Sequence, residues 1–131
     1  MRPMTSTWTD DELTTVGAAD ELQITSRRPD GTLRPWVTIW VVRAGDDLYV
    51  RSAYGSDNPW FRRAQAGGAG RIRAGGLERD VTFAGAAPDA HPGIDDAYHR
   101  KYDRYGPAIV DTVVGAGAAP VTIRLLPAAT K

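Results

Sequence analysis

Short apolar runs follow one another along the chain, and most of them alternate with polar residues in the way that β-strands do. The longest run, residues 36–42 (WVTIWVV), carries no charge and is mostly apolar on both faces. We therefore expect it to form a central strand that is covered on both sides. Residues 43–47 supply a hairpin turn and residues 48–53 the returning strand. The same alternation predicts four further strands, at residues 21–27, 71–74, 77–83 and 121–125.

Helices are predicted between these strands from capping residues and apolar spacing. Thr9 and Glu12 have the spacing of a capping box, so a short helix should begin there. Asn58 suits the N-cap position and Pro59 the first helical position of a second helix. Residues 107–114 can form a further helix. Residues 94–105 should form a longer one, whose single buried face carries Ile94, Tyr98, Tyr102 and Tyr105.

This order of hairpins and intervening helices predicts the fold class. It favours a mainly β, α+β architecture, a small six-stranded antiparallel barrel with peripheral helices, over a βαβ sheet. The sequence shows no internal repeat and no domain boundary. Residues 9–131 are therefore expected to form one domain after a flexible tail of residues 1–8.

The composition restricts the classes of function. The chain has 131 residues, 42% of them hydrophobic and 24% charged, which is typical of a soluble globular domain. Its 16 basic and 16 acidic residues cancel, so we expect neither a nucleic acid nor an acidic membrane surface as a partner. Cysteine is absent, and His91 and His99 lack metal-ligand spacing, so we expect no metal site. No run approaches the roughly 20 apolar residues of a membrane helix, and residues 1–7 lack the apolar core of a signal peptide, so we expect a cytoplasmic protein.

Candidate binding chemistry is concentrated where the strand at residues 48–53 meets the helix that follows Asn58. Arg51 and Ser52 end the strand, and the first backbone N–H groups of the helix point toward the same region. Arginine, hydroxyl and free N–H groups together can hold an anion. The alternative is that Arg51 is an ordinary exposed arginine on a strand.

Several motifs resemble those of the FMN-binding split-barrel superfamily, which includes pyridoxamine-phosphate oxidases and deazaflavin-dependent nitroreductases. These motifs are Gly31-x-x-Arg34-x-Trp36, Leu48-Tyr-Val-Arg51-Ser52 and Asn58-Pro-Trp60-Phe-Arg-Arg-Ala64. Within that group the chain is similar to an uncharacterised family of small single-domain proteins, over roughly residues 20–127. The resemblance implies a split β-barrel, a flavin or deazaflavin cofactor, and a homodimer with the cofactor at its seam.

The resemblance also implies roles for individual residues. The cofactor ring would be faced by Trp36, Thr38 and Trp40. The phosphate would be held by Arg34, Arg51, Ser52 and Tyr54. The substrate entrance would be lined by Asn58, Trp60, Arg63, Tyr98 and Tyr102. Core packing is the competing interpretation for the tryptophans and tyrosines, and a solvated helix face is the competing interpretation for Arg63.

Three hypotheses of function follow. The first is a flavin- or deazaflavin-dependent oxidoreductase, in which the cofactor performs the chemistry and the protein orients it. The second is a cofactor-free enzyme or ligand-binding protein of a biosynthetic pathway that kept the fold and lost the flavin. Asp57 favours this second hypothesis, because its charge would repel a phosphate in the loop before the helix. The third is an interaction module without a ligand.

Overall fold

A computed structural model describes residues 8–53, 55 and 57–128. One antiparallel sheet holds the seven strands of these residues, in the order β2-β1-β5-β6-β7-β4-β3. The strands are β1 (Leu22–Ser26), β2 (Val37–Ile39), β3 (Val42–Ala44), β4 (Asp47–Arg51), β5 (Ala69–Ala74), β6 (Leu77–Ala84) and β7 (Thr122–Pro127). The helices are α1 (Asp10–Ala18), α2 (Pro59–Gly67), α3 (His91–Tyr102) and α4 (Pro107–Val110), with 3-10 turns at Pro88–Ala90, Asp103–Tyr105, Asp111–Val113 and Ala119–Val121.

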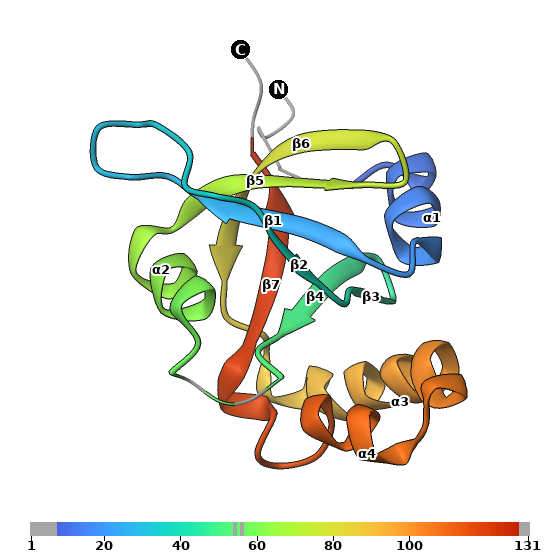
Figure 1. The fold of residues 1–131 in the computed structure, drawn as a ribbon. Coiled ribbons are helices and arrows are strands. Elements are labelled where there is room, and N and C mark those ends of the chain that lie inside the picture. Colours follow the sequence, from blue (N-terminus) through green and yellow to red (C-terminus); the bar gives the residue numbers. More distant parts are fainter. Residues whose placement is uncertain (1–7, 54, 56, 129–131) are drawn as a thin grey trace.

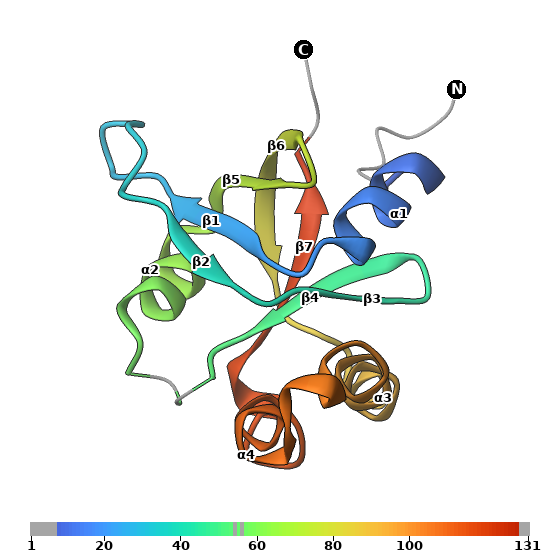
Figure 2. The same cartoon turned by 45° about the vertical axis from the view of Figure 1, so that its right-hand side comes forward.

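The sheet curls into a half-barrel because its two edge strands are consecutive in the chain. β2 and β3 lie at opposite ends of the strand order, and only Trp40 and Val41 separate them (Figures 1 and 2). The prediction of one central strand over residues 36–42 is therefore wrong, and this bend raises the strand number from six to seven. The hydroxyl of Tyr102 accepts from Val41 N at 3.1 Å and lies 3.0 Å from Val41 O. These bonds satisfy backbone groups that a continuous strand would pair with a neighbour.

Side chains along this bent segment still alternate between two faces. Val37 and Ile39 pack against the barrel interior, whereas Thr38 is exposed. On the outer face the Arg73 guanidinium lies 4.1 Å from the ring centroid of Trp36, and Trp40 stacks on Tyr102 with 4.0 Å between centroids.

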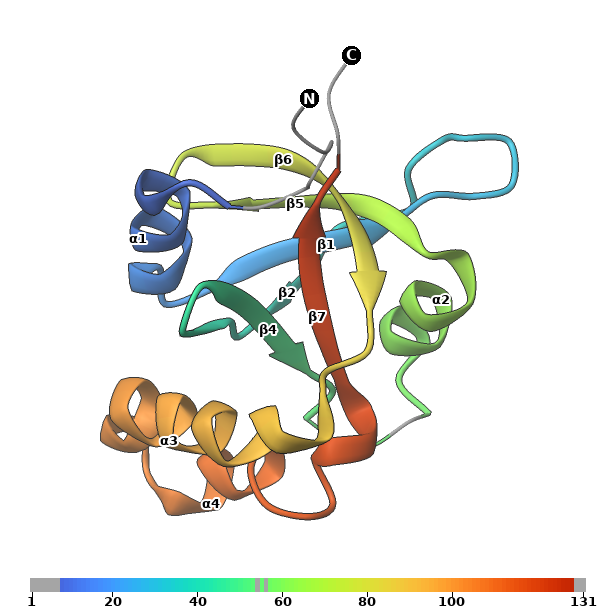
Figure 3. The ribbon, with the colours of Figure 1, turned by 180° about the vertical axis from the view of Figure 1, so that it is seen from behind.

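Two hydrophobic clusters hold the helices to the sheet. α1 and α2 cover opposite ends of the barrel, and α3 and α4 lie together beneath the β3–β4 hairpin (Figures 1 and 3). The barrel cluster includes Leu13 of α1 and Phe61 of α2. The second cluster joins α3 and α4 to β3 and β4 through Val42, Tyr49, Ile94, Ala97, Tyr98, Tyr102, Val110 and Val113.

Most of the locally coded elements match their predictions. The capping box of α1 is present, with Thr9 and Glu12 bonded to each other's backbone N–H. α2 begins at Pro59, although the Asn58 side chain makes no capping bond. α3 ends at Tyr102, earlier than predicted, and a 3-10 turn leaves Tyr105 48% exposed. None of the described helices has the length and apolarity needed to cross a membrane.

Candidate functional site

The free edge of β2 and the end of β4 border a cavity of about 270 Å³. β2 pairs only with β1 among the described strands, so its other edge is available for hydrogen bonds to a ligand. Apolar groups form most of the wall. The lining residues are Val37, Thr38, Ile39, Trp40, Arg51, Ala53, Asn58, Trp60, Ile109, Thr112 and Val113.

Arg51 lies in the wall of this cavity, but its guanidinium is bound within the protein. Its side chain has no exposed surface, and Nη1 lies 2.5 Å from Asp95 Oδ1 and 2.7 Å from Val113 O. Nε donates to Thr122 Oγ1 at 2.8 Å, and Nη2 lies 3.2 Å from His91 Nδ1. An arginine has five N–H groups, so these four contacts leave one. Arg51 therefore anchors α3 and the turn at Asp111–Val113 to the end of β4.

The other groups predicted at the phosphate are also accounted for. Ser52 is fully buried, and its hydroxyl donates to Gly55 O at 2.5 Å. Tyr54 lies outside the described residues. Asn58 lines the cavity with its side chain free of a capping bond. The sequence-predicted cradle at Arg51 and Ser52 thus has little remaining capacity to donate to a phosphate.

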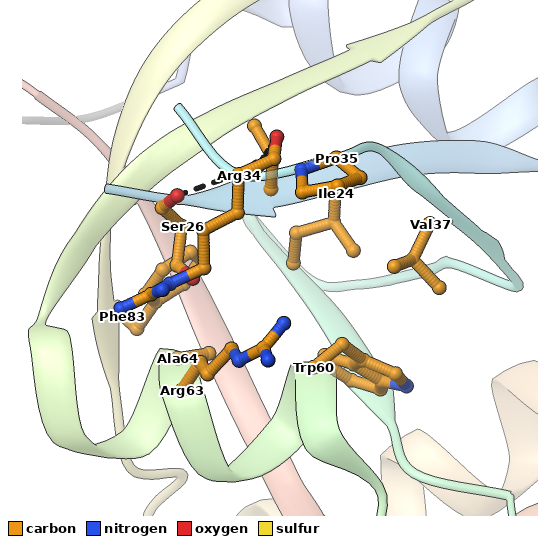
Figure 4. Close-up of a pocket in the computed structure, with 10 residues that line it drawn as sticks. Ile24, Ser26, Arg34, Pro35, Val37, Trp60, Arg63, Ala64 and Phe83 are labelled. Atoms are coloured by element: carbon orange, nitrogen blue, oxygen red, sulfur yellow. Dashed lines mark hydrogen bonds between the residues drawn. The ribbon is translucent and has the colours of Figure 1, made fainter. Parts of the chain in front are cut away.

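A second, narrower cleft adjoins the cavity, because Val37 and Trp60 line both (Figure 4). Arg34, from the segment before β2, and Arg63, from α2, extend into this cleft beside Phe83. The cleft has a volume of about 20 Å³, which is room for about one water molecule. Arg63 is exposed, so its side chain can move to admit a larger group.

The two arginines of this cleft are free of the ion pairs that occupy several other arginines of the described chain. Arg27 and Arg71 both bind Asp80, Arg79 binds Glu12, and Arg104 binds Asp20. Neither Arg34 nor Arg63 has an acidic partner within residues 8–53, 55 and 57–128. The Nε atom of Arg34 is buried without a hydrogen-bond partner among those residues. A buried donor without a partner is unfavourable, so this group can bind an anion that supplies one.

The aromatic residues predicted at the site divide between wall and core. Trp40 and Trp60 line the cavity, and Trp36 lies outside it against Arg73. Tyr98 and Tyr102 line neither cavity and belong to the second cluster. Burial raises the pKa of both tyrosine hydroxyls. Both tyrosines contribute to the packing of α3 against β3 and β4.

Sequence reasoning missed one wall of the cavity. Ile109, Thr112 and Val113 come from the segment after α3, which folds back toward β2. No local signal marks these residues as lining, because only the tertiary fold brings them there. Among the described residues, no three His, Asp or Glu side chains cluster closely enough to bind a metal ion.

Solved structures of low sequence identity share this fold. A pyridoxamine 5′-phosphate oxidase-like protein from Listeria innocua is 12% identical, with 93% of each chain covered and a TM-score of 0.60. A FAD-binding protein from Mesorhizobium loti is 20% identical, with 93% of this chain and 91% of that chain covered and a TM-score of 0.53. An F420 reductase is 15% identical over 90% of this chain and 92% of that chain, with a TM-score of 0.53. At these identities the likeness shows the fold alone, and it confirms the predicted antiparallel split barrel.

Sequence comparisons give the family. No curated protein matches the chain significantly. Residues 12–125 match the family described as "Uncharacterized protein conserved in bacteria (DUF2255)", and the chain belongs to that family.

Proposed function

We propose that this split-barrel chain binds a flavin or deazaflavin and works with it as an oxidoreductase. One observation carries the proposal: an apolar cavity at the open edge of β2 adjoins a cleft with two arginines that have no acidic partner among the described residues. Flavins and deazaflavins combine a planar, largely apolar ring system with a phosphate-bearing side chain. The two adjoining spaces match these two parts in chemistry.

The larger cavity has the character of a ring site. Trp40, Trp60 and Ile109 supply apolar walls, and the unpaired edge of β2 supplies backbone groups for the polar rim of a ring. A volume of about 270 Å³ lies just below the range of roughly 300–1,000 Å³ typical of ligand pockets. The cavity therefore suits the ring system and leaves the side chain to the neighbouring cleft.

The narrower cleft has the character of a phosphate site. Arginine binds phosphate through two parallel N–H groups, and Arg34 and Arg63 approach the cleft from different elements (Figure 4). The buried Nε of Arg34 would gain the acceptor that it lacks. Arg51 adds positive charge to the ring site, although Asp95 offsets much of it.

The protein's part in the chemistry would be to bind, orient and shield. A bound flavin or deazaflavin supplies the hydride transfer. The indoles of Trp40 and Trp60 would fix the ring plane and exclude water from it. Two proteins that share the fold, a FAD-binding protein and an F420 reductase, support a cofactor of this class.

We further propose that a homodimer completes the site. The exposed large hydrophobic residues of the described chain are Tyr105 and Ile109, and Ile109 lines the cavity. A second copy packed there would cover apolar surface and close the open side of the ring site. Light scattering should give twice the mass of one chain, and Ile109→Glu should shift it toward one. A monomeric wild-type protein would contradict the dimer.

Arginine variants test the cofactor proposal. Fluorescence titration of the wild-type protein with FMN, FAD and F420 should give saturable binding of at least one. Arg34→Ala and Arg63→Ala should each weaken that binding by about 10–100-fold, because each removes a charge-assisted hydrogen bond to phosphate. Arg62→Ala is the matched control, since Arg62 lies on the same helix, is exposed and does not line the cleft. Equal affinities in all three variants would contradict the phosphate site.

A second candidate function follows from the internal hydrogen bonds of Arg51 and Ser52, which leave these residues little capacity to bind the phosphate of a flavin. In this alternative the fold binds a different anionic small molecule without flavin. A thermal-shift screen of aromatic phosphates and carboxylates distinguishes the two functions. Stabilisation by such a compound, lost in Arg34→Ala, together with no binding of FMN, FAD or F420, would favour the alternative.

A further inference from the structure

Three aromatic rings connect the wall of the larger cavity to the outside of the chain. Trp40 lines the cavity and stacks on Tyr102, with 4.0 Å between the ring centroids and an angle of 5° between the ring planes. The ring of Tyr105 lies 5.6 Å from that of Trp40 and 6.1 Å from that of Tyr102. Because Tyr105 is 48% exposed, these contacts lead from the cavity to a tyrosine outside it.

Trp60, the other tryptophan of the cavity, has a different aromatic neighbour. Its ring lies 6.0 Å from that of Phe61, edge to face, and it is paired with no tyrosine ring among the described residues. A phenyl ring carries no ionisable proton and is much harder to oxidise than a phenol. In the described part of the chain, Trp40 is therefore the cavity-lining tryptophan whose oxidation can pass to a tyrosine.

The two tyrosines beside Trp40 differ in the group that can accept the phenolic proton. The hydroxyl of Tyr102 donates to Asp20 O at 2.8 Å and lies 3.0 Å from Val41 O, and burial raises its pKa. Backbone carbonyl oxygens are too weakly basic to take a proton from it. The hydroxyl of Tyr105 donates instead to the carboxylate of Asp20, over 3.5 Å at an exposed position where water can bridge the two groups. Tyr105 can therefore lose its proton when it is oxidised, and Tyr102 cannot.

Arg104 holds Tyr105 and Asp20 next to each other. Its Nη2 donates to the Tyr105 hydroxyl at 3.2 Å and also binds the Asp20 carboxylate. Its guanidinium lies 4.9 Å from the centroid of the Tyr105 ring. The hydrogen bond from Arg104 can remain in place after the phenolic proton has moved to the carboxylate, because the phenolic oxygen is its acceptor.

We propose that Trp40 and Tyr105 form a one-electron route out of the cavity. The route rests on the proposed function, because its oxidant is a flavin or deazaflavin in the cavity that light has excited. The indole of Trp40 gives this oxidant one electron and becomes a radical cation. The phenol of Tyr105 then returns one electron to Trp40 and gives its proton to Asp20, which leaves a neutral indole, a neutral tyrosyl radical and a protonated carboxyl group. Oxidation that begins at the ring site thus ends outside it.

Pulse radiolysis of the full-length protein tests the transfer without a cofactor. Azide radicals oxidise tryptophan side chains, and absorption then follows the decay of indole radicals and the growth of tyrosyl radicals. The wild type should show first-order growth of the tyrosyl signal, at a rate independent of protein concentration. Trp40→Phe and Tyr105→Phe should each remove most of this growth, and Asp20→Asn should slow it, because the phenol loses its proton acceptor. Tyr49→Phe is the matched control, since the ring of Tyr49 is paired with no other described aromatic ring.

A laser flash on the cofactor-loaded protein tests the complete route. Binding of FMN, FAD and F420 is measured first by fluorescence titration. Absence of binding would contradict the proposed function, while the radiolysis still decides the transfer between Trp40 and Tyr105. In a protein that binds one of the three, the flash should give a tyrosyl signal that is lost in Tyr105→Phe at unchanged affinity, because Tyr105 lines neither cavity. A tyrosyl signal that survives in Tyr105→Phe, or a wild type without first-order tyrosyl growth after radiolysis, would overturn the route.

Discussion

Replacing Arg51 with alanine distinguishes a structural anchor from a ligand-binding residue. The guanidinium joins β4 to Asp95 of α3, to Val113 O and to Thr122, with all three distances between 2.5 and 2.8 Å. The substitution removes these contacts together and leaves the Asp95 carboxylate without its cation. Because Arg51 is fully buried, water could replace the lost bonds only by entering from the adjoining cavity that Arg51 borders.

The buried ion pair between Arg51 and Asp95 determines the size of this effect. Removing one partner of a buried ion pair costs about 3–5 kcal/mol. The Asp95 side chain is 29% exposed, so solvent recovers part of its hydration and the lower end applies, about 3 kcal/mol. For a chain of 131 residues, each kcal/mol lowers the melting temperature by about 3–5 °C. Arg51→Ala should therefore melt about 10 °C below the wild type.

Urea denaturation followed by tryptophan fluorescence measures the free energy of unfolding directly. Arg124→Ala is the control, since its weak contact with Asp47 spans 3.9 Å at a partly exposed position, and it should cost less than about 1 kcal/mol. Asp95→Ala and the double variant complete a cycle that should show a coupling of about 1–3 kcal/mol. An Arg51→Ala protein as stable as the wild type, but about tenfold weaker for flavin, would refute the anchor and restore Arg51 as a phosphate ligand.

Three further predictions concern the tyrosines, Lys101 and two glycines. Tyr102→Phe should lower the free energy of unfolding by about 1–3 kcal/mol, because Val41 N loses its acceptor and Asp20 O loses its donor, while Val41 O keeps Lys101 Nζ. Tyr98→Phe should cost clearly less, because its buried hydroxyl has no partner among the described residues, and equal losses in denaturation would contradict this difference. The pKa of Lys101 falls from an ordinary value of 10.5 to about 8, so the unfolded chain binds more protons than the folded chain between pH 8 and pH 10.5. The free energy of unfolding of the wild type, relative to that of Lys101→Met, should therefore rise with pH across this window. A difference that does not change with pH would contradict the lowered pKa. Gly70→Ala should lower the free energy of unfolding by about 3 kcal/mol or more, because the new Cβ would lie 2.1 Å from Thr25 O. Gly93→Ala lies in open space on α3 and should raise the free energy of unfolding by about 0.5–1 kcal/mol. Gly93→Ala should therefore have the higher melting temperature of the two, and the reverse order would contradict both predictions.

Local signals in the sequence were enough for the elements that depend on neighbouring residues. The capping box at Thr9 and the hairpin turn within residues 43–47 each depend on a few adjacent residues, and both are present. The start of α2 at Pro59 is of the same kind. The order of these elements then limited the fold to an antiparallel barrel with helices around it.

The bend at Trp40 and Val41 could not be predicted in this way. A run of β-branched and aromatic residues favours a continuous strand, and nothing next to it in the sequence indicates a break. The groups that bind Val41 are Tyr102 and Lys101, about 60 residues later in the chain. The final pairing of these backbone groups is thus a tertiary effect, and the bend leaves β2 at the edge of the sheet.

For the candidate site, too, the sequence could predict individual residues but not the contacts that depend on the tertiary fold. The sequence could identify Arg34, Trp40, Arg51 and Trp60 as candidates, and each lines one or both cavities. It could not show that Asp95 and Thr122 would occupy the guanidinium of Arg51, since they lie 44 and 71 residues away in the chain. It also could not show that Arg34 and Arg63 would line one cleft whose described lining residues include no Asp or Glu.

Native mass spectrometry tests the central claim, that the two adjoining cavities hold one flavin-type cofactor. The purified protein is mixed in turn with FMN, FAD and F420 and sprayed from a non-denaturing buffer. The account predicts one cofactor per chain for at least one of the three, and loss of that complex in the double variant Arg34→Ala/Arg63→Ala. Bare chain in all three mixtures, or a complex that survives in the double variant, would contradict it.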